Sequence, residues 1–266
     1  MSLLAGCGGV GTREQIIVNG STTILPIAEL AAKGFEERHE GASVLVSGMG
    51  SSAGIEAVSA GTAHIGTSSR DLKPEEESLR LTDVPIAFDG IAVIVNPANP
   101  VDALTVAQLR DIFSGRVTNW RELGGEDRGI DLVNRDEASG TREAFKKIVM
   151  GEEAAFDRSA VVLPGTGQVR DVVSRSPGAI GYISLGFVPP RFTNTTVKAV
   201  TVDGVVPSEE SVTSREYPIA RALHFFTNGE PNGLTKAFID YVLSDEVQQG
   251  VVVDAGFVPV TERGGE

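Results

Sequence analysis

The sequence predicts an α/β protein with mostly parallel strands and helices on both faces of the sheet. Short β-type runs alternate with segments whose apolar residues recur at helical spacing. At three of these junctions the chain carries a small polar turn: Ser21-Thr22-Thr23, Gly50-Ser51-Ser52 and Ser139-Gly140-Thr141. Ligands of such folds bind beyond the carboxyl ends of the strands, so we expect all three turns on the ligand side.

The first two units of strand, turn and helix lie near the amino terminus. A β-type run at residues 15–18 precedes the first turn, and a helix with its apolar residues on one face follows to about His39. Residues 44–46 predict the second strand, and the second turn leads into a helix that carries Ile55 and Val58. The repetition indicates that the two turns have the same structural role.

A third predicted strand, residues 64–71, also ends in small polar residues. The apolar stretch 84–95 is interrupted by Asp89-Gly90 and therefore predicts two consecutive strands separated by a bend. Such a bend is a candidate crossover between domains, and 266 residues suit either one large or two ordinary domains.

The second half of the chain continues the alternation. Its predicted elements are a helix at 105–113, the strand 130–133 and helix to 149 around the third turn, a helix at 165–175, a strand at 179–183, a hairpin at 197–206, a β-type run at 218–226, helices at 236–243 and 246–253, and an extended end at 256–260. The run at 218–226 is placed to carry the chain back across the domain boundary.

The third turn has the composition of an anion site. The first amides of a helix lack carbonyl partners and lie at the positive end of the helix dipole, so they favour a negative charge. Ser139, Gly140 and Thr141 add hydroxyls and room for close approach, and the planar fork of Arg135 suits an oxyanion. The alternative is an ordinary helix cap with Arg135 and Arg142 in solvent.

Charge and composition exclude several other classes. A net charge of −13 argues against nucleic acid as a partner. The three histidines do not have metal-ligand spacing, and one cysteine allows neither a zinc cluster nor an internal disulfide. Gly165-Thr166-Gly167 lacks the rest of a dinucleotide fingerprint and is interpreted as a loop and helix start. We therefore expect no metal and no cofactor.

The single cysteine has its own interpretation. Leu4-Ala5-Gly6-Cys7 resembles a bacterial lipobox, in which Cys7 is lipidated after cleavage of a leader, and the glycine-rich residues 8–12 would form a flexible tether. A chance cysteine in a glycine-rich tail is the alternative. The lipobox interpretation predicts an extracytoplasmic protein attached to the membrane only through a lipid on Cys7.

Taken together, these motifs resemble those of the phosphate-binding proteins of bacterial ABC importers, which have the class II periplasmic-binding-protein fold. The resemblance covers nearly the whole chain after the tether and is carried by GSTTILP at 20–26, GSSAG at 50–54, the run 104–120, RDEASGTR at 135–142 and PGAIGY at 177–182. It implies two α/β lobes joined by two crossovers that close on one phosphate. Domain 1 would comprise residues 13–88 and 219–266, and domain 2 residues 89–218.

The resemblance also implies a set of binding residues. The family's phosphate contacts fall on Thr22, Thr23, Ser51, Ser69, Arg135, Ser139, Gly140 and Thr141. Glu137 matches an acidic position that helps to fix the arginine, although a carboxylate in the first turn of a helix is also favoured by the dipole alone. The family further implies a membrane permease as partner and a monomeric state.

One position departs from the family pattern. Phosphate at neutral pH still carries a proton, and the family places an aspartate there to accept it; Ser69 occupies that position here. Discrimination against sulfate is then weaker unless Asp71 or another carboxylate reaches the site. Arg70 either contacts the anion or pairs with Asp71, and we favour the pair.

The sequence thus predicts a non-enzymatic binding protein for inorganic phosphate. A binding protein for another tetrahedral oxyanion, such as sulfate or molybdate, is the first alternative. A phosphatase with Ser139 or Thr141 as nucleophile is the second, and it is disfavoured because no histidine or metal cluster accompanies these motifs.

Overall fold

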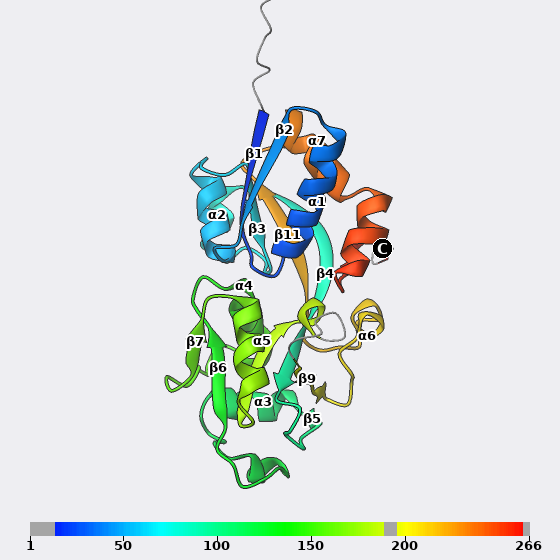
Figure 1. Ribbon diagram of the computed structural model, residues 1–266. Coiled ribbons are helices and arrows are strands. Elements are labelled where there is room, and N and C mark those ends of the chain that lie inside the picture. Colours follow the sequence, from blue (N-terminus) through cyan, green and yellow to red (C-terminus); the bar gives the residue numbers. More distant parts are fainter. Residues whose placement is uncertain (1–13, 189–195, 263–266) are drawn as a thin grey trace, which may run out of the picture.

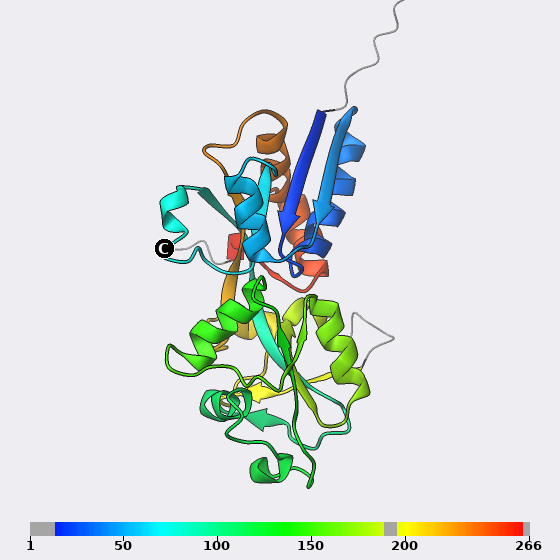
Figure 2. The same ribbon diagram turned by 90° about the vertical axis from the view of Figure 1, so that its left-hand side faces the viewer.

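The computed structural model describes residues 14–188 and 196–262, which form two lobes, one above the other in Figure 1. The view in Figure 2, turned by 90°, shows the same division. The predicted lipobox with Cys7 and the predicted tether, which together span residues 1–12, lie outside the described residues. Among the described helices, none has both the length and the apolar character needed to cross a membrane.

The upper lobe is built on three parallel strands. β1 (Glu14–Gly20) lies between β2 (Ala42–Ser47) and β3 (Ile65–Ser68), and each strand leads into a turn on the side that faces the lower lobe. The helices of this lobe are α1 (Leu25–Arg38), α2 (Ser51–Ser59) and α7 (Gly233–Val242). Its core contains Ile16, Phe35, Phe225 and Phe238.

The lower lobe repeats the parallel arrangement. β6 (Asp131–Arg135) lies between β8 (Ala179–Ser184) and β7 (Val161–Leu163) and runs parallel to both. The main helices are α3 (Val106–Phe113), α4 (Gly140–Phe145) and α5 (Thr166–Arg175). In the core, Phe145 stacks on Tyr182 with ring centroids 4.1 Å apart, and Phe113 packs edge-on against both.

Two strands connect the lobes. β4 (Thr82–Val95) pairs antiparallel with β11 (Ala220–Thr227) through residues 82–90 and with β8 through residues 91–95, so the strand order is β2-β1-β3-β11-β4-β8-β6-β7. This confirms the predicted two-lobed α/β fold with mixed sheets. The expected break at Asp89-Gly90 is wrong, because β4 exchanges one partner strand for another there and remains continuous.

The domain boundaries predicted at 88/89 and 218/219 fall in β4 and immediately before β11, and they remain a proposal.

Of the predicted hairpin around Asp203-Gly204, the structure shows a single antiparallel bridge between Val202 and Val205. The other elements are β5 (Ala103–Leu104), β9 (Lys198–Ala199), β10 (Thr201–Val202), α6 (Glu209–Thr213), β12 (Val258–Pro259), single 3-10 turns at Glu77–Leu79, Trp120–Leu123, Leu185–Phe187 and Val260–Glu262, and π-helical turns at Lys146–Met150 and Val247–Val252.

Candidate anion-binding site

The small polar turns of the two lobes meet at the boundary between them. Ser51, at the start of α2, places its Oγ 3.3 Å from the Ser69 Oγ and accepts a hydrogen bond from the Ser69 amide at 3.1 Å. Gly140 of α4 comes so close that a Cβ atom on it would lie 2.2 Å from the Ser51 Oγ and 2.8 Å from the Ser69 Oγ. Only a residue without a side chain fits there while the lobes are in this arrangement.

Two pairs of threonines also face each other across the lobe boundary. The Thr23 and Thr141 hydroxyl oxygens are 3.2 Å apart, and those of Thr22 and Thr166 are 3.0 Å apart. Thr22 is half-buried and the other three are buried. Each pair joins the start of an upper-lobe helix to the start of a lower-lobe helix, so hydroxyls converge from both lobes.

Arg135 supplies a positive charge to this group of hydroxyls. The side chain is only 2% exposed, and its Nη2 and Nη1 donate to the Thr22 and Thr166 hydroxyls, each at 3.2 Å. Nε donates to the Leu163 carbonyl at 3.1 Å and Nη2 to the Pro164 carbonyl at 2.7 Å. Burial lowers the pKa of Arg135 to about 10, so the guanidinium still carries its charge at neutral pH.

Ser139 has the role of a helix cap. Its Oγ accepts from the Arg142 amide at 3.2 Å at the start of α4. The cap interpretation is therefore correct for the Ser139 hydroxyl, but not for Arg135, which is buried in the site and not in solvent.

A second buried cation, which the sequence analysis did not predict as part of the site, adjoins it. Arg221 of β11 donates to the Ser69 carbonyl at 3.0 Å and to the Thr23 hydroxyl at 3.4 Å, and its Nη2 lies 2.8 Å from the Asp89 Oδ2. Burial raises the pKa of Asp89 and lowers that of Arg221, while the attraction within the pair opposes both shifts. The available signal was a charged residue inside each of the two apolar runs 84–95 and 218–226, which seldom occurs without a partner.

Thr166 was missed as well. The sequence interpretation of residues 165–167 stopped at a helix start, and α5 does begin there. What the sequence did not reveal is that this start lies against Thr22 and Arg135.

The three supporting residues have other contacts than expected. Arg70 forms a two-pronged ion pair with Glu76 at 2.6 and 2.8 Å and reaches only the backbone carbonyl of Asp71, so the predicted Arg70–Asp71 ion pair is wrong. The chain turns between Lys73 and Glu76 and brings the Glu76 carboxylate back onto Arg70.

Asp71 and Glu137 lie away from the hydroxyls. The Asp71 carboxylate is 3.1 Å from the Lys147 Nζ and 3.6 Å from the His224 Nε2. Glu137 is exposed, and carbonyl groups occupy the place on Arg135 that was expected for its carboxylate. Within the described chain, neither carboxylate is hydrogen-bonded to the Ser69 hydroxyl, which lies against that of Ser51.

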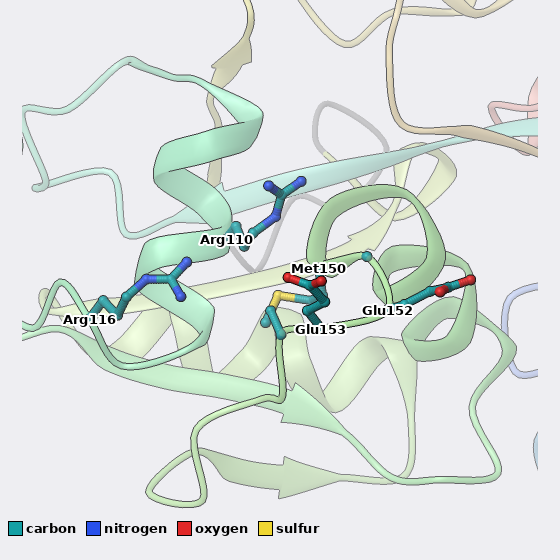
Figure 3. Close-up of a pocket in the computed structure, with 7 residues that line it drawn as sticks. Arg110, Arg116, Met150, Glu152 and Glu153 are labelled. Atoms are coloured by element: carbon teal, nitrogen blue, oxygen red, sulfur yellow. The ribbon is translucent and has the colours of Figure 1, made fainter.

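Two hollows lie outside the hydroxyl cluster. One, of about 560 Å³, opens between the lobes and includes Arg70, Lys73, Glu143, Lys147 and Arg221. The other, of about 500 Å³, lies in the lower lobe (Figure 3), where Arg110 and Arg116 lie on one side and Met150, Glu152 and Glu153 on the other. In the described residues, no group of three His, Cys, Asp or Glu side chains is placed to hold a metal ion.

The two-lobed fold, with a cation and convergent hydroxyls at the lobe boundary, defines a binding protein of the periplasmic type. A family model described as the PBP superfamily domain matches residues 8–246. The phosphate-binding protein PstS of Bacillus subtilis is 33% identical over 98% of this chain and 91% of its own length.

Solved structures agree with these sequence relatives. A chain from Clostridium perfringens, described as a phosphate ABC transporter substrate-binding protein with bound phosphate, is 38% identical with a TM-score of 0.88 over 93% of this chain and all of its own. An ABC-type phosphate transport receptor from Vibrio cholerae is 32% identical with a TM-score of 0.76, over 91% of this chain and 99% of its own. The chain belongs to the PBP superfamily and, within it, to the PstS family of phosphate-binding proteins.

Proposed function

We propose that this chain is a solute-binding protein that captures inorganic phosphate between its lobes and delivers it to the permease of an ABC transporter. The observation that carries the proposal is the buried Arg135 guanidinium, which donates to one hydroxyl from each lobe. Relatives and solved structures named for phosphate binding or transport, at up to 38% identity, support the same ligand.

The chemistry of the hydroxyls fits an oxyanion. Arginine only donates hydrogen bonds, so the Thr22 and Thr166 oxygens both accept from Arg135. The two hydroxyls also share one hydrogen bond at 3.0 Å, which uses one of their two hydrogens and leaves the other for another acceptor. Charged, donor-rich sites of this kind bind oxyanions through short, charge-assisted hydrogen bonds. The proposed contacts are Thr22, Thr23, Ser51, Ser69, Arg135, Ser139, Gly140 and Thr141, to which the geometry adds Thr166.

Binding without catalysis is the role that the surroundings favour. A serine or threonine nucleophile needs a base beside it. His224 lies against Asp83, His64 accepts from the Ile17 amide, and His39 lies on Phe35. Each histidine therefore has a partner other than Ser139 or Thr141.

The cellular setting follows from the same proposal. A protein that delivers phosphate to an ABC permease acts outside the cytoplasm. We propose that a lipid on Cys7 is its only attachment to the membrane and that it acts as a monomer.

Calorimetric titration of phosphate-stripped protein with phosphate, arsenate, sulfate and molybdate tests the ligand. We expect one strong site for phosphate, competition by arsenate, and weaker binding of sulfate. Heat with sulfate or molybdate and none with phosphate would assign the site to another oxyanion. Release of p-nitrophenol from p-nitrophenyl phosphate that disappears in Ser139→Ala would instead indicate a phosphatase.

A further inference from the structure

The two strands that connect the lobes carry a buried ion pair at directly opposite positions. Arg221 of β11 and Asp89 of β4 are partners in the antiparallel ladder, and their side chains are 4% and 0% exposed. Arg221 donates to the Asp89 Oδ2 through Nε at 3.1 Å and through Nη2 at 2.8 Å. The pair therefore fixes the guanidinium in one orientation between the lobes.

The contacts of this pair extend into both lobes. Asp89 accepts through Oδ1 from the Ser184 hydroxyl at 2.8 Å and from the Leu185 amide at 3.2 Å, which belong to the lower lobe. Arg221 donates to the Ser69 carbonyl and to the Thr23 hydroxyl, which belong to the upper lobe. The ion pair therefore fixes these two groups of each lobe relative to the two connecting strands.

The contact with Thr23 determines what that hydroxyl can do. Because a guanidinium only donates, the Thr23 oxygen is an acceptor toward Arg221 and its hydrogen is free to point elsewhere. The Thr141 hydroxyl of the lower lobe lies within hydrogen-bond distance of it, at 3.2 Å, so the free side of the Thr23 hydroxyl faces the lobe boundary. The positive charge of Arg221 also adds to that of Arg135, and repulsion from Arg221 contributes, after burial, to the lowered pKa of Arg135.

We propose that Arg221 is a positioning residue of the anion site: anchored by Asp89, it orients the Thr23 hydroxyl as a donor to the anion and places a second positive charge behind it. This inference rests on the proposed capture of phosphate. It assigns to the connecting strands a role in binding in addition to joining the lobes.

The test uses phosphate calorimetry on the full chain. Arg221→Met removes the donors and the charge, and Asp89→Asn in the same chain avoids an unpaired buried carboxylate. We expect this double variant to bind phosphate about 10- to 100-fold more weakly, in line with the loss of a charge-assisted hydrogen bond. Asp89→Asn alone retains the cation and an amide oxygen that can accept from it, so its loss of affinity is expected to be smaller than that of the double variant, and Arg221→Lys is expected to recover part of the loss.

Coupling to Thr23 distinguishes positioning from general stability. If Arg221 acts through the Thr23 hydroxyl, the two losses should not multiply. The triple variant, Thr23→Val with Asp89→Asn and Arg221→Met, should lose much less affinity than the product of the Thr23→Val loss and the Asp89→Asn/Arg221→Met loss. The control is a second ion pair of the upper lobe, between the buried Arg70 and the half-buried Glu76: Arg70→Met with Glu76→Gln should lower thermal stability and leave phosphate affinity unchanged.

Three results would overturn the inference: wild-type affinity in the Asp89→Asn/Arg221→Met variant, an equal loss in the Arg70/Glu76 control, or effects of Thr23→Val and Arg221→Met that multiply independently. Wild-type protein that binds no phosphate would overturn the proposed function as well. If that double variant fails to fold, Arg221→Lys combined with Thr23→Val answers the same question of coupling.

Discussion

Gly140 of the lower lobe faces Ser51 of the upper lobe so closely that the glycine's missing Cβ would lie 2.2 Å from the serine hydroxyl oxygen. This contact exists only while the lobes are together. Closure and ligand binding are therefore tested by the smallest possible change at this position.

Gly140→Ala should weaken phosphate binding by about 10- to 100-fold, because the added methyl group overlaps the Ser51 and Ser69 hydroxyls unless the lobes separate. The free energy of unfolding without ligand should change little, since opening the cleft relieves the overlap. Calorimetry and thermal unfolding measure the two quantities. Gly167→Ala, in the first turn of α5, is the matched control and should bind normally, because a Cβ there meets nothing within 4 Å apart from its chain neighbours and the backbone of its own helix.

Ser69→Asp should sharpen selectivity. A carboxylate at this position can accept the proton that phosphate carries and sulfate lacks, so the ratio of phosphate to sulfate affinity should rise about tenfold or more. Ser69→Ala removes the hydroxyl without adding charge and should leave that ratio nearly unchanged. A ratio that does not respond to Ser69→Asp would indicate that the phosphate proton is accepted elsewhere in the site.

His224 should make stability depend on pH. Burial by itself lowers the pKa of His224, but Asp71 and Asp83 outweigh it and raise the pKa to about 9. The unfolded value is about 6.5, so the charged histidine stabilises the fold fully below pH 6.5 and loses this effect as pH rises through 9. His224→Gln should cost about 2 to 3 kcal/mol of unfolding free energy at pH 6 and much less at pH 10. Equal costs at both pH values would contradict this account.

Lys147→Ala should have little effect on phosphate binding. Its ion pair with Asp71 joins the two lobes, but both side chains are mostly exposed, at 77% and 66%. Exposed ion pairs are screened by solvent and salt, so the affinity should change by less than about threefold. A larger loss, measured by calorimetry at 150 mM salt, would mean that contacts at the cleft edge control closure.

The sequence indicated the three polar turns because each follows a strand end and opens a helix, and that local pattern survives folding. It could indicate that Arg221 and Asp89 each need a partner, but not that they pair with each other, since that pairing depends on the register of two strands and the residues are 132 positions apart. The role of Thr166 could not be predicted for a related reason, because it depends on the position of α5 beside Arg135. Asp71 was predicted as the partner of Arg70 because it is adjacent in sequence, whereas the turn before Glu76 makes Glu76 the partner.

The most direct test is a phosphate titration of phosphate-stripped wild-type protein beside Arg135→Met. We predict one site per chain in the wild type and a loss of about 3 to 5 kcal/mol of binding free energy in Arg135→Met, because the anion would lose its buried, charged partner. Arg142→Met, which removes a nearby cation paired with Glu143, should bind as the wild type does. No binding by the wild type, or unchanged binding by Arg135→Met, would contradict the account.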